Sequence, residues 1–168
     1  MLTRFLAPRA DLAYALLRII AGLMFGFHGL QKIFGVLTEH PPPLGTQLWF
    51  GGLIELVTGF AIAAGALTRC AAFLASGTMA VAYVQFHWRL SFGARFFPGV
   101  NQGELALLYS FLFLYIACRG GGRGTVDAWR ARRASSPTAA ARPSPSASAA
   151  PSSAAPSGGP SQRTPRMD

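Results

Sequence analysis

The sequence predicts an all-α membrane protein: a bundle of four transmembrane helices followed by a disordered C-terminal tail. Three observations predict this class: few charged residues, four apolar segments joined by short loops, and an abrupt change of composition after the fourth segment. Hydrophobic residues make up 51% of the 168 residues and charged residues only 12%. A soluble domain carries about 25% charged residues, so lipid is the better solvent for much of this chain.

The four apolar segments cover about residues 12–34, 47–67, 70–88 and 104–118. The first three have the roughly 20 residues that cross a bilayer core, while the fourth is shorter. Prolines and glycines interrupt the helical pattern between them, notably at residues 41–43 and 93–99. A soluble bundle is the alternative interpretation, but four helices that are apolar all round cannot all be central in so small a domain.

Residues 1–127 therefore form the predicted transmembrane domain, and residues 128–168 form a tail rich in Ala, Pro, Ser and Arg. The tail lacks the apolar surface needed to offset the entropy of ordering, so we expect it to be disordered. With four spans, the N-terminus, the turn at Arg69 and the tail lie on one side of the membrane. Most arginines lie on that side, which predicts that both termini are cytoplasmic. The same rule accounts for the net charge of +9, and we expect no nucleic-acid partner.

Polar side chains within or beside the spans are the candidate functional residues. A charged residue at the centre of a membrane helix costs about 2.5–3.5 kcal/mol. Such residues therefore face the bundle, pair with one another or mark a functional path. The candidate polar site consists of Arg18, His28, Lys32, Glu55, His87, Asn101 and Glu104.

Helical periodicity of about 100° per residue predicts which face of each span points inward. The predicted inward faces are Tyr14, Arg18, Gly22, Phe25, Gly29 and Lys32 on the first span; Gly51, Glu55 and Gly59 on the second; Ser76, Met79, Tyr83 and His87 on the third; and Glu104, Leu108, Phe111 and Tyr115 on the fourth.

The rise of about 1.5 Å per residue places His28 and Glu55 at similar depths below the outer ends of their spans. We therefore expect either His28 or Lys32 to pair with Glu55. Arg18 lies deeper toward the cytoplasmic side, from where its long side chain could reach Glu55 or extend to the interface. The other polar groups gather in the outer half of the bundle.

The sequence leaves several alternatives open. Arg18 and Glu55 could form a purely structural ion pair that fixes helix register. His28 and His87 could be merely hydrogen-bonded rather than ligands, and two His with two Glu could form a metal site, although no spacing demands one and we predict no metal. The aromatic residues could be packing residues or a wall that stacks on a quinone: Tyr83, Phe111 and Tyr115.

Four blocks of residues occur together in a characteristic order. They are Leu17-Arg18 with Phe27-His28-Gly29 and Gln31-Lys32; Glu55 with Gly59 and Gly65; Leu67-Thr68-Arg69 with Ala71-Ala72; and Phe97-Pro98 with Asn101-Gln102-Gly103-Glu104. In these blocks the sequence resembles the DoxX family of small bacterial membrane proteins, over about residues 12–127. In the last block, Gln102 replaces the first glycine of the family's N-G-G-E pattern. The resemblance implies a four-helix protein of the bacterial inner membrane.

The resemblance also implies a function, because some relatives are tied to oxidoreductases that pass electrons to quinone, or to complexes that manage thiol and oxidative stress. We therefore expect a membrane subunit of a redox system, with a quinone as its candidate ligand and an oxidoreductase subunit as its partner. His28 and Glu55 could exchange a proton with a quinone oxygen that Lys32 polarises. The alternatives are a small oligomeric carrier or channel subunit, and a membrane scaffold that recruits a partner through its tail.

Overall fold

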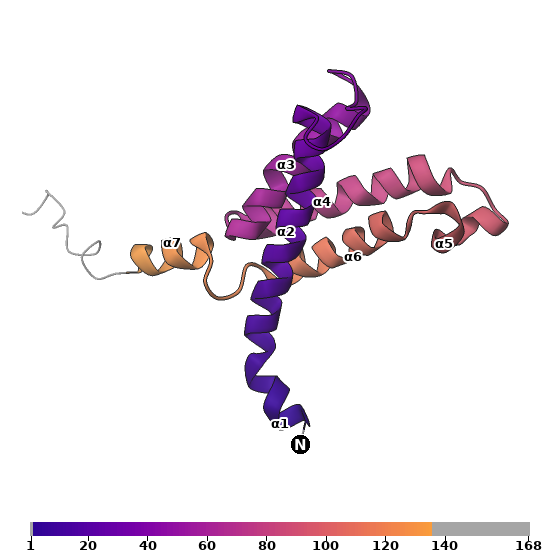
Figure 1. Cartoon of the computed structure of the whole chain (residues 1–168). Helices are drawn as coiled ribbons and strands as arrows, with labels where there is room; N and C mark the ends of the chain where they lie inside the picture. The colour runs from indigo at the N-terminus through magenta and orange to yellow at the C-terminus, as the bar shows by residue number, and fades with distance from the viewer. Residues whose placement is uncertain (1, 136–168) are drawn as a thin grey trace, which may run out of the picture. The chain divides into compact units, whose positions relative to one another are not determined.

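The computed structural model describes residues 2–135, and these residues form helices joined by turns, without a strand among them (Figure 1). The all-α prediction is therefore confirmed for this part of the chain. The disorder expected for residues 136–168 lies outside the described residues. The helical and 3₁₀ elements are α1 (Leu2–Leu6), η1 (Ala7–Arg9), α2 (Ala10–Phe34), α3 (Gln47–Ala64), α4 (Thr68–Ala82), η2 (Tyr83–Trp88), η3 (Ala94–Phe96), α5 (Pro98–Asn101), α6 (Glu104–Arg119) and α7 (Val126–Ala134).

The four long helices begin within two residues of the predicted spans. Gly35 and Gly65 end α2 and α3 in the left-handed conformation, with φ of +67° and +71°, which a glycine adopts without strain. Thr46 caps α3 by accepting a hydrogen bond from the backbone of Trp49 at 3.3 Å. The domain boundary expected after residue 127 falls inside α7, so order extends seven residues into the predicted tail, to Ala134.

The helices pack as two antiparallel pairs, α2 with α3 and α4 with α6, and the two pairs run in different directions in Figure 1 rather than as four parallel helices. Glycines let α2 and α3 touch through their backbones. A Cβ on Gly22 would lie 2.6 Å from the backbone nitrogen of Ala63 and 2.7 Å from the carbonyl oxygen of Gly59. Close approach through small residues is the usual way in which helices associate in lipid.

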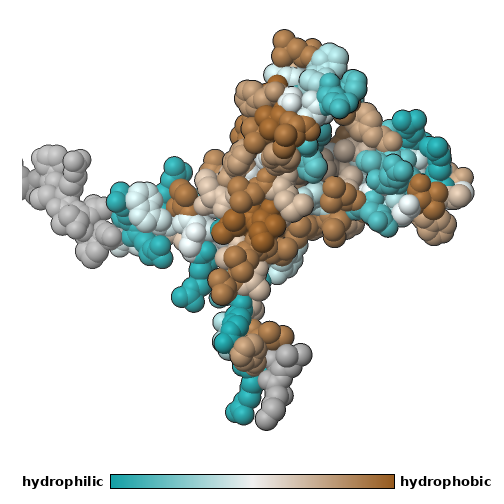
Figure 2. Space-filling view, viewed as in Figure 1, coloured by the Kyte–Doolittle hydropathy of each residue, from teal (hydrophilic) through white to brown (hydrophobic). Residues whose placement is uncertain are grey.

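Within residues 2–135, two helical segments are long and apolar enough to cross a membrane, Arg4–Phe34 and Gln47–Ala64. The helices α4 and α6 are shorter, with 15 and 16 residues. Large hydrophobic side chains are nevertheless exposed on all four helices, for example Leu23 on α2, Val57 on α3, Phe73 on α4 and Phe111 on α6. Figure 2 shows such side chains as a broad brown surface over the helices. An apolar exterior of this extent is suited to lipid.

One end of the helical domain is held together by polar contacts between segments far apart in the sequence. The side chain of Tyr14 donates to the carbonyl of Gly120, and Arg119 pairs with Asp11 at 2.9 Å. Arg69, at the start of α4, donates to the carbonyl of Cys118 at 2.9 Å. The start of α2, the α3–α4 turn and the end of α6 therefore lie together, which we call the closed end.

Candidate functional site

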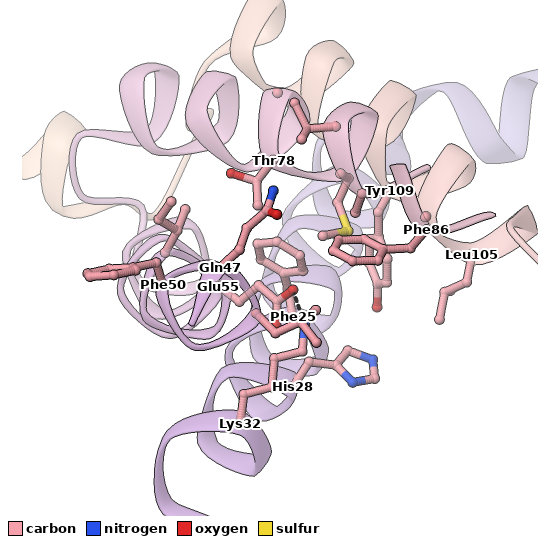
Figure 3. Close-up of a pocket in the computed structure, with 18 of the residues that line it drawn as sticks. Phe25, His28, Lys32, Gln47, Phe50, Glu55, Thr78, Phe86, Leu105 and Tyr109 are labelled. Atoms are coloured by element: carbon pink, nitrogen blue, oxygen red, sulfur yellow. Dashed lines mark hydrogen bonds and ion pairs between the residues drawn. The ribbon is translucent and has the colours of Figure 1, made fainter. Parts of the chain in front are cut away.

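A cavity of about 740 Å³ lies between the two helix pairs, toward the opposite end of α2 (Figure 3). Its walls come from α2, α3, α4 with η2, and α6. They are mostly apolar, and Phe25, Phe50, Phe86 and Tyr109 contribute aromatic rings. A cavity of this size with a few polar groups has the character of a small-molecule site. The predicted site residues that line the cavity are His28, Lys32, Glu55 and His87.

Glu55 is the most deeply buried polar group of this cavity, with only 3% of its side chain exposed. The ammonium of Lys32 donates to Oε1 of Glu55 at 2.5 Å, as the dashed line in Figure 3 marks. The second oxygen, Oε2, is buried and has no hydrogen-bond partner. Of the two expected partners of Glu55, the structure therefore selects Lys32 rather than His28. An unpaired buried carboxylate oxygen is costly and is unusual unless the site serves a purpose.

Gly52 positions Lys32 for this contact. A Cβ on Gly52 would lie 2.5 Å from the Cβ of Lys32 and 3.2 Å from its Cδ, so the lysine stem lies directly over this glycine. The stem then leads the ammonium along α3 to Glu55, one turn further on. Gly51, which we expected on the same face as Glu55, also lines the cavity, but a Cβ there would meet nothing within 4 Å. The glycine in contact with Lys32 is its neighbour, Gly52.

Both histidines of the cavity use Nδ1 for a contact within the protein. Nδ1 of His87 lies 3.3 Å from the carbonyl oxygen of Asn101, and Nδ1 of His28 lies 3.2 Å from Oε1 of Gln31. The backbone carbonyl of Asn101 only accepts, so a neutral His87 carries its proton on Nδ1 and leaves Nε2 as an acceptor. The side-chain amide of Gln31 can both donate and accept, so it is compatible with either tautomer of His28. Among residues 2–135, no three His, Cys, Asp or Glu side chains lie close enough together to hold a metal ion.

Arg18 belongs to the closed end and does not pair with Glu55, which was one of the alternatives that the sequence left open. Its guanidinium donates to the carbonyl of Ile62 and, at 2.7 Å, to that of Ala63. These carbonyls belong to the last turn of α3, about 10 Å along the helix from Glu55. The last carbonyls of a helix lack the usual donor four residues further on, and the negative end of the helix dipole attracts a cation. The carbonyl of Ile62 also accepts from the backbone of Gly65 at 3.1 Å. Arg18, only 1% exposed, therefore caps α3 from the neighbouring helix.

Asn101 and Glu104 also lie outside the cavity lining. Asn101 organises the loop before α6: its amide donates to the carbonyl of Arg95 at 2.9 Å, and its side-chain oxygen accepts from Gly103 at 2.8 Å. Glu104 is exposed in the first turn of α6, where the helix dipole favours a carboxylate. The structure thus brings together four of the seven predicted site residues.

The predicted inward face of α6 is wrong. Leu108, Phe111 and Tyr115 are exposed, together with Glu104. The buried face is instead Ala106, Tyr109, Ser110, Phe113 and Ile116. The aromatic residues of the cavity wall are Phe25, Phe50, Phe73, Phe86 and Tyr109. The residues for which the sequence left both packing and a quinone wall open do not line the cavity: Tyr83, Phe111 and Tyr115.

The segment η2 is a π-helix that continues α4, and sequence reasoning did not anticipate it. Its widened turn is visible where the backbone of Arg89 donates to the carbonyl of Val84, five residues back, at 2.9 Å. Such turns occur often at functional sites because they change the direction of side chains along a helix. Here the segment supplies Phe86 and His87 to the cavity. Gln85, in the same segment, accepts a hydrogen bond from the side chain of Gln47 at the start of α3.

Comparison with known proteins identifies the family. The sequence model of the DoxX family matches residues 13–88. An uncharacterized protein of Haemophilus influenzae is 41% identical over 117 residues, which cover 67% of this chain and 87% of that protein. The chain belongs to the DoxX family. No solved structure matches it.

The DoxX match covers α2, α3, α4 and η2, and these elements carry every charged and imidazole group of the cavity: His28, Lys32, Glu55 and His87. Asn101 and Glu104 lie beyond the matched residues. DoxX proteins are membrane proteins, in agreement with the apolar exterior and the two helices long enough to span a bilayer.

Proposed function

We propose that this DoxX protein is a membrane subunit of a redox system and that its cavity binds a quinone-type ligand. The observation that carries the proposal is the buried Oε2 of Glu55, which has no partner although it belongs to a residue lining a cavity of about 740 Å³. A ligand that brings a polar head to this carboxylate would relieve the penalty of the unpaired oxygen.

The proposed membrane arrangement follows the element order. α2, α3, α4 with η2, and α6 lie in the bilayer, and both termini are cytoplasmic in the bacterial inner membrane. The clustering of the start of α2, the α3–α4 turn and the end of α6 supports this, because a four-span chain must place these segments on one side. Arg69 and Arg119 at this closed end agree with the preference of basic residues for the cytoplasmic side.

The walls of the cavity fit the ring and tail of a quinone. Phe25 and Tyr109 lie 5.6 Å apart, centroid to centroid, and offer aromatic surface against which a flat ring could pack. Leu48, Leu74 and Val81 extend the apolar lining. Lys32 and Glu55, which also line the cavity, would meet the oxygens of the ring. A partner oxidoreductase subunit would exchange electrons with the bound ligand.

Direct binding tests the proposal. The purified protein in lipid nanodiscs is titrated with a short-chain quinone analogue, and quenching of tryptophan fluorescence is recorded against empty nanodiscs. We expect saturable quenching, at least tenfold weaker binding for Glu55→Gln, and unchanged binding for Glu104→Gln, whose carboxylate lies outside the cavity.

A second variant blocks the cavity without touching a charge. Gly77 lines the cavity, and a Cβ there would meet nothing within 4 Å, so Gly77→Leu adds volume to the cavity without a clash at Cβ. We expect this variant to fold normally and to lose quinone-dependent quenching. Quenching that does not saturate, or that is equal in wild type and Gly77→Leu, would refute the proposed function.

A further inference from the structure

The hydrogen-bonding groups of the cavity restrict which substituents a flat ring ligand can carry. Glu55 forms an ion pair with Lys32, so its carboxylate has no proton to give and Oε2 can only accept. The ammonium of Lys32 donates one of its three N–H groups to Oε1, and the other two can donate to an oxygen of the ligand. The unmet requirement at the most buried polar atom is therefore a hydrogen-bond donor.

The imidazole of His87 imposes the same requirement. In its neutral form, the contact with the backbone carbonyl of Asn101 places the proton on Nδ1 and leaves Nε2 as an acceptor. Thr78, which also lines the cavity, donates its hydroxyl proton to the carbonyl of Leu74, and Gln47 donates one of its two amide protons to Gln85.

Tyr109 does not reverse this preference. Its hydroxyl can both donate and accept, so it can pair with a ligand carbonyl or a ligand hydroxyl. A ligand hydroxyl can accept from Tyr109 or Lys32 and also donate to Glu55, whereas a carbonyl can only accept and leaves Oε2 unpaired. A ligand hydroxyl is therefore favoured over a ligand carbonyl beside Glu55, because a hydrogen bond to a charged carboxylate is stronger than one between neutral groups.

We propose that the cavity selects phenolic ligands, that is, the reduced hydroxyl form of a quinone over its oxidised carbonyl form, through donation of the phenol O–H to Oε2 of Glu55. This inference rests on the proposed function and narrows its ligand. It assigns Glu55 the role of a specificity-determining residue that contacts the ligand directly. A dicarbonyl ring of the same size would leave Oε2 unpaired and would bind more weakly.

The test uses a pair of redox-stable probes that differ only in the donor. The probes are 4-heptyloxyphenol and its methyl ether, and equilibrium dialysis against the full-length protein in nanodiscs measures binding, with empty nanodiscs subtracted for partitioning into lipid. We expect the phenol to bind wild type at least about tenfold more tightly than the ether, since a hydrogen bond to a charged group is worth at least one such factor.

Two variants test whether Glu55 is responsible for the preference for the phenol over the ether. In Glu55→Gln the phenol and the ether should bind within about threefold of each other, because the amide replaces a charged acceptor by a neutral group that also donates. Glu104→Gln is the matched control and should keep the wild-type ratio. The comparison of phenol with ether in wild type needs no variant, so misfolding of Glu55→Gln would not prevent the test.

Each outcome has a distinct meaning. Equal binding of phenol and ether to wild type overturns donor selection while leaving a quinone-type site intact. A preference that persists unchanged in folded Glu55→Gln also overturns it, because another acceptor must then be responsible. Absence of binding by both probes and by the quinone analogue contradicts the proposed function itself.

Discussion

The ammonium of Lys32 lies 2.5 Å from Oε1 of Glu55, and the two members of this ion pair differ greatly in burial: 31% of the lysine side chain is exposed but only 3% of the glutamate side chain. The buried carboxylate is therefore stabilised mainly by the lysine ammonium, whereas the partly exposed lysine can also reach a polar environment. This asymmetry predicts how the pair responds when either member is removed.

Lys32→Met should destabilise the fold by about 2 kcal/mol, because it leaves a buried carboxylate without its counter-charge. Glu55→Gln should have a smaller effect, since the released lysine can extend toward a polar environment. The double variant should recover most of the stability lost in Lys32→Met. Thermal unfolding in detergent measures all three, and equal losses in both single variants would argue against the asymmetry.

Gly59→Ala should force α2 and α3 apart. The added Cβ would overlap the backbone of Gly26 and lie 2.8 Å from the carbonyl oxygen of Gly22, and backbone atoms cannot move aside cheaply. We expect a loss of about 2 kcal/mol or more in the free energy of unfolding. Gly51→Ala is the control on the same helix, because its Cβ has open space; it should be neutral or slightly stabilising.

Arg18→Met should separate stability from ligand binding. The substitution leaves the last carbonyls of α3 without their cap and should lower the free energy of unfolding by about 2 kcal/mol. Affinity for a quinone analogue, measured on the folded fraction, should stay within twofold of wild type. A variant that keeps its stability but loses the ligand would place Arg18 in the binding site instead.

Asp127 should make the attachment of α7 sensitive to acid. Its carboxylate accepts from the backbone of Leu67 at 2.8 Å and from the backbone and hydroxyl of Thr68, both at 2.9 Å. These hydrogen bonds, above all that from the backbone of Thr68, hold the pKa of Asp127 below its ordinary value of 3.8.

A lowered pKa means that this stabilisation is complete above the pKa of the unfolded chain, about 3.9, and is lost as the pH falls through the lower pKa of the folded form. Wild type should therefore show faster amide exchange at Leu67 and Thr68 at pH 2 than the intrinsic pH dependence predicts. In Asp127→Asn the protection should already be reduced at pH 6 and should change little with acid. Asp11→Asn, at the exposed pair with Arg119, should keep the wild-type profile at these amides.

Sequence reasoning found the inward face of α2 because that helix carries charges that lipid penalises: Tyr14, Arg18, Gly22, Phe25 and Gly29 are all buried as expected. It failed on α6, where the helix is apolar on every side and its face was inferred from Glu104. That residue lies in the first turn, where exposure and the helix dipole satisfy a carboxylate without any inward partner.

The partner of Arg18 could not be predicted for a related reason. Side chains can be matched by their charges in a sequence, but the acceptors of Arg18 are the backbone carbonyls of Ile62 and Ala63, which every residue possesses. Only the packing of α2 against α3 shows which carbonyls lie within reach. The widened turn of η2 could not be predicted either, because no residue type specifies a π-helix.

The central claim is that the cavity beside Glu55 is the ligand site, and photolabelling in native membranes tests it most directly. A quinone carrying a photoreactive group on its tail is activated, and labelled peptides are identified by mass spectrometry. We predict labels on the cavity walls formed by residues 47–54 of α3 and 73–82 of α4, competed by unlabelled quinone and lost in Gly77→Leu. Labels confined to the closed end or to the exposed face of α6, or labelling unchanged in Gly77→Leu, would contradict the claim.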